Sequence, residues 1–413
     1  MPSASMNSVP EVPLLRDRSF LTLWAVGALN STGRWLEMLV IAIFVLERTG
    51  SPLLVASMLM LRLLPMALFG LFSGVLAHRF ERWRLLRIAS SVIVLMSFAA
   101  FGLATIDALQ VWHAGVASFV SGVVWSTDFP VRRTLIGDIA GPHRVSRAMS
   151  LDILAGSGTR MLGPLVGGIL YQQIGLNGAF LLSAILYVGG LILLGSNKQS
   201  TTEQPLAEQS VMDNLQGGWR VLRDSRTLKG ILAVTVVFNI WGFPFVSMIP
   251  VFAKEVLDLN AAATGMLVSV EGAGAMLGAL GLSLFARSEH SRYLYLAAVL
   301  AYCLFAFAFS LSTWIWLSAA LLLSVGFVSA AFGSMQSALI LMNSPAGFER
   351  QMMGVLAVCI GTAPLGFLHI GLLADWLGVS LACTITAIEG MLAMLFVVWR
   401  WPTLRSMQPL NEM

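Results

Sequence analysis

Residues 147–175 read RAMSLDILAGSGTRMLGPLVGGILYQQIG, and residues 350–378 read RQMMGVLAVCIGTAPLGFLHIGLLADWLG. Both stretches are largely apolar and long enough to cross a membrane as a helix, and they match at a constant offset of 203 residues. A repeat of this kind is typical of two similar helical bundles in one chain. The matched pairs are Arg147/Arg350, Met149/Met352, Gly158/Gly361, Gly163/Gly366, Gly168/Gly371, Leu170/Leu373 and Gly175/Gly378.

The repeat also appears near the start of each half. The tripeptide LRD stands at residues 15–17 and again at 222–224, and the pair Asn30/Gly33 recurs as Asn239/Gly242. The offset drifts from 203 to 209 because loop lengths differ. An even number of spans in each half predicts a parallel repeat about an axis along the membrane normal, with the substrate path on that axis.

The composition indicates a membrane protein. Of the 413 residues, 57% are hydrophobic and 11% are charged, whereas soluble domains carry about 25% charged residues. A soluble core cannot hold that much apolar sequence, so lipid must cover much of the surface. The net charge of +4 is expected to reflect membrane topology rather than nucleic-acid binding.

Apolar runs between charge clusters predict an all-α membrane protein of twelve transmembrane helices. We expect an N-terminal six-helix bundle over residues 1–196, a cytoplasmic linker over 197–228 with a short amphipathic helix around Trp219, and a C-terminal six-helix bundle over 229–413. The predicted spans are 20–46, 53–77, 85–105, 111–131, 149–171, 177–195, 229–253, 262–286, 292–311, 313–342, 353–374 and 379–400.

The distribution of Lys and Arg predicts the orientation. With the N-terminus in the cytoplasm, twenty basic residues fall inside and only Arg48 and Lys254 fall outside, while three lie within spans, which accounts for all 25. Both termini are therefore expected in the cytoplasm of a bacterium, with the chain in the inner membrane. The first twenty residues lack the pattern of a cleaved signal peptide, so the first span is expected to direct insertion.

The cysteines and histidines suggest neither a metal site nor an enzyme. Cys303, Cys359 and Cys383 lie in apolar runs without metal-ligand spacing, and the five histidines form no catalytic set. The glycine run GAGAMLGALG at 272–281 lacks the Lys-Ser/Thr of a phosphate-binding loop and lies within a span, so we interpret it as helix packing. We expect no cofactor and no metal, and without an ATP site an ion gradient must drive any active transport.

Three segments resemble the major facilitator superfamily, and the likeness covers essentially the whole chain. They are GVLAHRFERWR at 74–84, FPVRRTLIGDI at 129–139 and GSGTRMLGPLVGGIL at 156–170. The first resembles the superfamily's basic loop, but with His78 in place of Asp and Glu81 in place of Gly. The other two are similar to segments of a bacterial exporter branch that includes siderophore, macrolide and multidrug exporters.

The resemblance implies gating roles for the basic loop and for span five. In the loop (Gly74, His78, Arg79, Arg82), the arginines would pair with acidic or carbonyl groups at the cytoplasmic ends of spans five and eleven. Positive-inside topology and lipid phosphate contacts are an alternative for the same loop, as is pH sensing by His78. In span five, Pro164 lets the helix bend, and small residues let another helix approach closely: Gly158, Gly163, Gly167 and Gly168.

Charged residues within spans are costly unless they are paired or hydrated, so each is a functional candidate. Equal depth predicts a buried Glu37–Arg62 pair. Arg160 and Glu271 both fall near mid-membrane in spans that adjoin in the superfamily, so they are a candidate bridge between the halves. Each pair is either a static salt bridge or a proton- or substrate-coupled group.

Four further charges have more limited interpretations. Asp128 is a third coupling candidate, although a hydrated ion pair with Arg132 and Arg133 is the simpler prediction. Arg34 shares a helix face with Glu37. Arg34 or Arg160 could instead bind an anionic substrate. Glu389, in the peripheral last span, is given no role.

The spans that line the cavity in the superfamily are rich in aromatic residues. Core packing explains most of them, and the rest suit an adaptable apolar cavity for an amphipathic compound. The cavity candidates are Asn30, Trp35, Trp125, Asn239, Trp241 and Phe245.

We therefore expect a secondary transporter that works by alternating access and exports a small organic, amphipathic compound in exchange for protons. Its partners would be that substrate, protons and membrane lipids, with the protein a monomer and no nucleic acid involved. Uptake or facilitated diffusion is the alternative within transport. A membrane sensor is disfavoured because the linker is too short to hold a soluble domain.

Overall fold

The computed structural model describes residues 14–79, 81–141, 143–196, 211–285, 291–345 and 347–404. Within these ranges the regular secondary structure is entirely helical. The first half contains α1 (Arg18–Thr49), α2 (Pro52–Arg79), α3 (Arg82–Thr105), α4 (Val111–Ala140), α5 (Val145–Ile174) and α6 (Leu176–Ser196). The second contains α8 (Arg226–Val237), η2 (Phe238–Gly242), η3 (Phe243–Met248), α9 (Ile249–Glu255), α10 (Ala261–Phe285), α11 (Ser291–Ser310), α12 (Ile315–Asn343), α13 (Glu349–Ile360), α14 (Ala363–Leu377) and α15 (Val379–Arg400).

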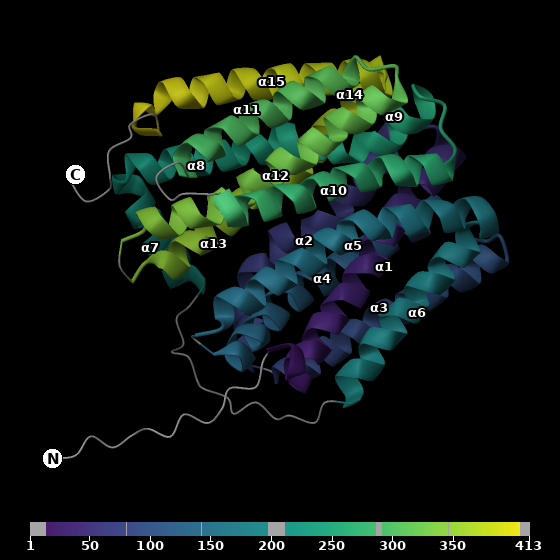
Figure 1. Cartoon of the computed structure of the whole chain (residues 1–413), viewed down its shortest axis with the longest axis horizontal. Coiled ribbons are helices and arrows are strands. Elements are labelled where there is room, and N and C mark those ends of the chain that lie inside the picture. Colours follow the sequence, from purple (N-terminus) through teal and green to yellow (C-terminus); the bar gives the residue numbers. More distant parts are fainter. Residues whose placement is uncertain are drawn as a thin grey trace.

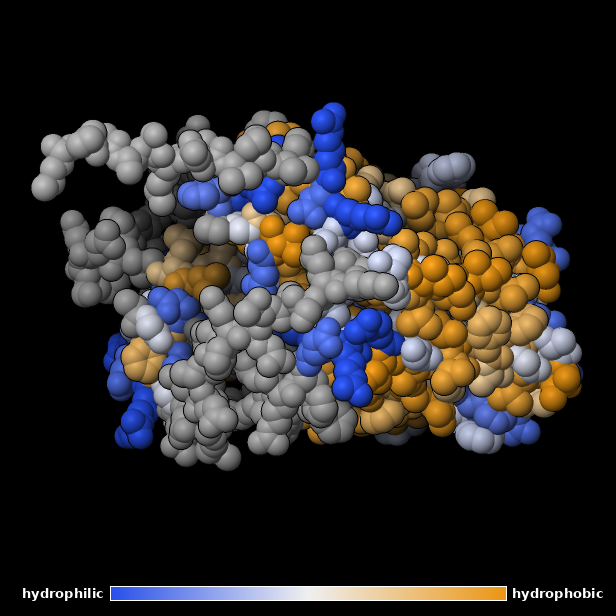
Figure 2. Space-filling model, turned by 90° about the horizontal axis from the view of Figure 1, so that it is seen from below, coloured by the Kyte–Doolittle hydropathy of each residue, from blue (hydrophilic) through white to orange (hydrophobic). Residues whose placement is uncertain are grey.

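These helices match the twelve predicted spans, so the predicted all-α membrane fold is confirmed. In the described part of the chain, ten helical segments are long and apolar enough to cross a membrane. Helices α2 and α4 complete the twelve. Helix α4 continues nine residues beyond the predicted end at 131, and this extension carries Arg132, Arg133 and Asp138. Figure 2 shows apolar residues spread over one side of the molecule, as a lipid-facing surface requires.

Spans seven and eleven are interrupted helices. Span seven runs from α8 through the π-helical segment η2 and the 3-10 segment η3 to α9, and Pro244 and Pro250 lie at the first positions of the last two segments. Span eleven divides into α13 and α14 around Gly361 and Thr362. Proline lacks a backbone N–H and clashes with the preceding turn, so breaks are expected at these positions.

The two halves meet along two pairs of helices. In the first half α1 packs against α4, α5 and α6, and in the second α12 packs against α10 and α11. Across the interface α5 lies against α10, as the neighbouring ribbons in Figure 1 show, and α2 lies against α14. This arrangement places spans five and eight in contact across the halves, as the resemblance implied.

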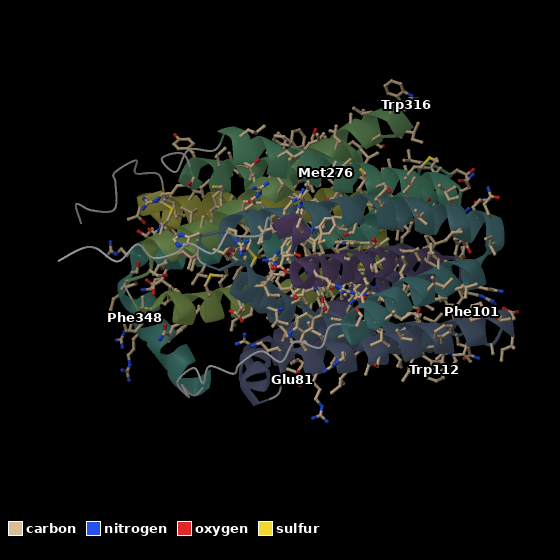
Figure 3. All side chains as sticks on the ribbon, turned by 60° about the horizontal axis from the view of Figure 1, so that its bottom comes forward. Glu81, Phe101, Trp112, Met276, Trp316 and Phe348 are labelled. Atoms are coloured by element: carbon tan, nitrogen blue, oxygen red, sulfur yellow. The ribbon has the colours of Figure 1, made fainter. Side chains whose placement is uncertain are left out.

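The predicted amphipathic helix around Trp219 is present as α7 (Val211–Asp224), which packs against α13. Trp219 is exposed. At the opposite end of the molecule, the side chains of Trp112 and Trp316 project outward (Figure 3) and are also exposed. Exposed tryptophans at both ends of a helical bundle are typical of the two membrane–water interfaces.

Candidate transport site

The predicted bridge between the halves is present. Arg160 of α5 donates from Nη2 to Oε1 of Glu271 on α10 across 2.5 Å. The Glu271 side chain is 3% exposed and that of Arg160 is 21% exposed. Glycine brings the two helices together, because a Cβ at Gly272 would lie 2.7 Å from the backbone nitrogen of Met161. A buried carboxylate at the junction of the halves therefore has a cation as its direct partner.

This ion pair lines a small pocket between the halves. The pocket has a volume of about 30 Å³, room for about one water molecule. The guanidinium of Arg160 lies 5.3 Å from the ring centroid of Trp35, so Trp35 reaches the predicted position. The lining residues are Trp35, Met38, Leu39, Ala42, Leu59, Arg160, Pro164, Val246, Ser247, Pro250, Val268 and Glu271.

Contacts at the end of the molecule where Arg48 and Lys254 lie hold the two halves together. The Ser51 hydroxyl at the start of α2 donates to Asp375 at the end of α14 over 2.7 Å. The backbone nitrogen of Ala261 donates to the Gln172 side chain over 3.2 Å. Toward the other end, a Cβ at Gly156 or Gly333 would meet open space. The pocket is thus closed on the side where Arg48 and Lys254 lie.

The span-five glycines pack as predicted, with one exception. A Cβ at Gly163 would lie 2.6 Å from Cβ of Trp35, and one at Gly167 would lie 3.1 Å from Leu36, so both positions admit α1. A Cβ at Gly168 would lie 2.5 Å from the carbonyl oxygen of Ala261 on α10. The prediction was wrong for Gly158, which has no neighbour within 4 Å of its would-be Cβ. Gly158 lies beyond the region where the halves touch.

The predicted Glu37–Arg62 ion pair was wrong in its contacts. Glu37 is buried inside the first half, where it accepts hydrogen bonds from Ser97 (2.9 Å) and Tyr187 (3.1 Å). Arg62 is also buried and donates to the carbonyl oxygen of Arg34 over 3.1 Å. Equal depth brought the two charges close enough to interact electrostatically. The depth of a residue does not determine which way its side chain points, and the Glu37 side chain points toward α3 and α6.

Arg34 takes part in a polar contact between α1, α4 and α5. Its Nη2 donates to the Ser31 hydroxyl over 3.1 Å, and Thr159 of α5 donates to the same hydroxyl over 2.9 Å. The guanidinium lies 4.8 Å from the ring centroid of Trp125 on α4. Arg34 and Trp125 were predicted as separate candidates, and the structure brings them together.

At the far end of α4, a buried cluster replaces the predicted hydrated ion pair. Arg132 Nε lies 3.6 Å from Asp128 Oδ2, and Arg133 Nε lies 3.1 Å from Asp152 Oδ2. Arg132 also makes a short ion pair with Asp152. Asp128, Arg132 and Asp152 are all buried, so the predicted hydration was wrong. Asp152 was missed, although its place in span five facing a basic pair was an available signal.

Several other cavity candidates lie elsewhere. Asn30 faces α6, where its Oδ1 would lie 2.8 Å from a Cβ at Gly190. Phe245 is buried against Phe309, with ring centroids 5.3 Å apart, and Asn239 donates to its own helix at Thr235. These predictions were wrong for span seven because η2 and η3 change the rotation per residue. The break turns Val246, Ser247 and Pro250 toward the pocket instead.

Trp241 was also predicted in the cavity, but it contacts a polar pair at the side of the second half. Its Nε1 donates to Oε2 of Glu389 on α15 over 3.0 Å, and His369 Nε2 of α14 lies 2.6 Å from the same oxygen. The side chains of His369 and Glu389 are 37% and 38% exposed. No role was predicted for Glu389, and its contact with His369 of span eleven was not predicted either.

Of the four gating candidates in the basic loop, only Arg82 is described at the side-chain level. Gly74, His78 and Arg79 lie outside the described side chains. Arg82 donates to Asp138 Oδ2 over 2.5 Å. The prediction of partners on spans five and eleven was therefore wrong for Arg82. Its partner is on span four because α4 extends far enough to bring Asp138 to the loop.

Comparison with known proteins identifies the family of the chain. The chain is 24% identical over 409 residues to the uncharacterized MFS-type transporter YfiS of Bacillus subtilis (strain 168), covering 90% of this chain and 91% of that protein. It is 22% identical over 288 residues to macrolide efflux protein A of Streptococcus pyogenes, covering 68% of this chain and 70% of the relative.

Solved structures share the fold. A bacterial homologue of the human lysosomal transporter Spinster, in an inward-facing and unoccupied conformation, superposes with a TM-score of 0.76 at 14% identity, covering 97% of this chain and all of that one. The family model described as transmembrane secretion effector matches residues 10–413. The predicted resemblance to the major facilitator superfamily is thereby confirmed, and the chain belongs to its transmembrane secretion effector family of membrane transporters.

Proposed function

We propose that this transporter exports an amphipathic organic compound in exchange for protons, by alternating access, with the Arg160–Glu271 pair as the coupling site. The observation that supports the proposal is the position of the pair: it joins the two halves and lines the pocket between them. A coupling carboxylate must lie on the transport path, and its attraction to a partner must change when it is protonated. Glu271 meets both conditions.

The ion pair links protonation to movement through simple electrostatics. While Glu271 is ionised, its attraction to Arg160 holds α5 against α10 and favours closure on the outer side. A proton on Glu271 removes that attraction and leaves Arg160 without a counter-charge, which favours separation of the helices. A proton taken up from outside would therefore loosen the outer side. Exchange is completed when the protonated transporter returns to the inward-open state and releases this proton to the cytoplasm, where the ion pair forms again.

The likeness to macrolide efflux protein A, which covers 68% of this chain, favours export over uptake. The lining of the pocket is compatible with such a substrate class. Trp35, Met38 and Leu39 provide an adaptable apolar wall, and Arg160 and Glu271 provide the polar groups. Arg34 over Trp125 remains a candidate for an anionic part of the substrate.

Glu37 is proposed as a second protonation site, within the first half. Its hydrogen bonds from Ser97 and Tyr187 and the nearby charge of Arg62 allow it to hold or release a proton without leaving an unpaired group. In the proposed topology both termini are cytoplasmic in a bacterial inner membrane. A monomer of two halves, 1–196 and 229–413, rocks about the pocket, and the 197–228 linker joins them.

Transport by proteoliposomes under an imposed pH gradient tests this proposal. A panel of radiolabelled amphipathic compounds, beginning with a macrolide, would be compared in wild type, Glu271→Gln, Glu37→Gln and the matched surface control Asp107→Asn. We expect Glu271→Gln to lose gradient-driven accumulation but to retain downhill exchange, and Asp107→Asn to behave as wild type. Full gradient-driven accumulation in both Glu271→Gln and Glu37→Gln would contradict the coupling assignment.

A further inference from the structure

A basic hollow lies at the end of the second half where α8 begins and α15 ends. Its volume is about 460 Å³. It is remote from the Arg160–Glu271 pocket, with which it shares no lining residue. The described residues that line it are Arg226, Lys229, Arg400, Trp401, Pro402 and Thr403.

The short segment η5 (Pro402–Leu404) helps to form the hollow by folding back over α8. The Leu404 side chain rests on Gly230, where a Cβ would lie 3.0 Å from it. Arg292 at the start of α11 donates to the carbonyl oxygen of Thr403 over 3.5 Å. Trp401 is positioned by its backbone nitrogen, which donates to Val397 of α15 over 3.0 Å. The hollow is thus built by packing and hydrogen bonds of three chain segments.

The charge of the hollow is one-sided. Arg226, Lys229 and Arg400 contribute three cations, and none of its described lining residues is a carboxylate. Among the described residues, these three cations take part in no ion pair. Lys229 donates to the carbonyl oxygen of Arg223 over 2.6 Å, and the Arg400 guanidinium lies 5.5 Å from the Trp401 ring centroid. Gathered like charges repel, so an anion is the ligand that such a hollow favours.

The surface next to the hollow points to a lipid. Leu392, Phe396 and Arg400 follow one another at four-residue spacing on α15, so they lie along one face of that helix. Leu392 and Phe396 are exposed, and so is the neighbouring Trp399. Aromatic side chains beside basic residues are typical of the membrane–water interface. An apolar stripe therefore leads along α15 to a basic hollow at interfacial depth.

We propose that this hollow binds the phosphate of an anionic phospholipid from the cytoplasmic leaflet, with an acyl chain along Leu392 and Phe396. Basic pockets between transmembrane helices on the cytoplasmic side suit such headgroups, and arginine recognises phosphate through paired N–H donors. A free phosphate ester shares this chemistry but would make no contact with the apolar stripe. The site is separate from the proposed transport path and from its coupling residues.

Lipid binding to the purified full chain tests the proposal. Native mass spectrometry and thermal unfolding in a neutral detergent would be measured with added phosphatidylglycerol, phosphatidylcholine or inorganic phosphate. The pocket variant is Arg226→Gln/Lys229→Gln/Arg400→Gln, and the matched control is Arg16→Gln/Arg18→Gln/Arg147→Gln, which removes three exposed basic residues elsewhere. We expect phosphatidylglycerol to stabilise wild type and control more than phosphatidylcholine does.

In the pocket variant, the affinity for phosphatidylglycerol should fall by about fivefold for each charge removed, which is roughly a hundredfold for all three. Equal affinity in the pocket variant and the control would overturn the proposal, as would equal stabilisation by the two lipids. If millimolar inorganic phosphate displaced phosphatidylglycerol and by itself raised the unfolding temperature as much as the lipid does, the proposal would be overturned and the hollow would be assigned to a soluble phosphate. If the triple variant does not fold, Arg400→Gln alone must still lower the affinity by about fivefold.

Discussion

The two halves share a fold and a glycine register, but the first half has charged residues at buried or half-buried positions where the second half has apolar side chains. At offsets of 203 or 209 residues, four charged residues of the first half correspond to uncharged residues of the second. Glu37 accepts hydrogen bonds from α3 and α6, Asp152 pairs with two arginines of α4, and Arg160 reaches the interface. The pairs are Arg34/Phe243, Glu37/Val246, Asp152/Val355 and Arg160/Ala363.

The second half is held together differently at its centre. The Phe238 and Phe332 rings stack with centroids 3.8 Å apart, and Tyr295 stacks on Phe332 at 5.3 Å. The Tyr295 and Thr235 hydroxyls share a hydrogen bond of 2.8 Å. Aromatic stacking and neutral hydrogen bonds do not depend on protonation in the range where carboxylates titrate.

This difference suggests a division of labour between the halves. The first half contains several charged groups at positions where the second half has apolar side chains, and the centre of the second half is an aromatic core that does not respond to protons. Glu271 is the carboxylate of the second half that contacts a charge of the first half. One ion pair therefore connects a charge-rich half to a charge-poor half, and the comparison can be tested by removing charges from either side.

The largest effect is expected from Asp152→Asn. The change leaves Arg132 with a single acidic partner at 3.6 Å and removes the acidic partner of Arg133. Loss of one member of a buried ion-pair cluster costs about 3–5 kcal/mol. The free energy of unfolding, measured by equilibrium unfolding in mixed micelles, should fall by about that amount.

The matched control is Asp107→Asn, because Asp107 is 87% exposed and pairs with Arg48 across 2.9 Å. Exposed pairs contribute about 0–1 kcal/mol, so this variant should be nearly as stable as wild type. If both Asp→Asn variants lost the same stability, the buried cluster would not be the special feature of the first half.

A smaller but clear effect is expected from glycine substitutions at the interface. Gly168→Leu would push its Cβ against the Ala261 carbonyl at 2.5 Å, while Gly371→Leu meets the Ala56 Cβ at 2.9 Å. Backbone cannot move aside as easily as a side chain, so Gly168→Leu should hinder outer closure more. We expect initial transport rates in proteoliposomes to fall about tenfold or more for Gly168→Leu, since a 1.4 kcal/mol barrier is tenfold in rate.

Gly158→Leu is the control for this test, because no atom lies within 4 Å of its would-be Cβ. Rates lowered equally by Gly158→Leu and Gly168→Leu would show that the loss comes from helix disruption rather than from the contact between halves.

The smallest effect is expected from Glu389→Gln. The glutamine oxygen can still accept the Trp241 N–H, and the His369 ring can stay neutral beside it. Because the hydrogen bonds described for this pair stay within the second half, gradient-driven transport should change by less than about twofold, within ~0.4 kcal/mol of the barrier. A loss comparable to that of Glu271→Gln would move the coupling site into the second half.

Much of the fold could be predicted from the sequence because lipid imposes a simple pattern. Twenty-residue apolar runs, charges between them and the repeated glycines led to all twelve spans. The helix ends were predicted less accurately. Helix α4 continues beyond its apolar run because Arg132 and Asp152 form an ion pair inside the protein. An apolar criterion cannot detect a helix that buries its own ion pairs.

Contacts in the site could be predicted where the depth of two residues in the membrane and the regular geometry of their helices determine whether they meet. Arg160 and Glu271 met because two regular helices with glycine contacts put equal depths in register. Asn239, Trp241 and Phe245 were misplaced because η2 and η3 break the helical rotation of span seven. The Gly242-Phe-Pro244 sequence marked the break, but not the direction in which the chain would continue.

The most direct test of the account is a pulsed electron–electron resonance measurement of the distance between the two halves at the end of the molecule where Arg48 and Lys254 lie. Spin labels on Gln173→Cys and Lys254→Cys, both exposed, would be placed in a chain with Cys303, Cys359 and Cys383 replaced by alanine. At alkaline pH, where Glu271 is ionised, wild type should show one short distance. Acidification, or Glu271→Gln at any pH, should add a longer one. A single short distance in Glu271→Gln at every pH would contradict the claim that this ion pair closes the transporter.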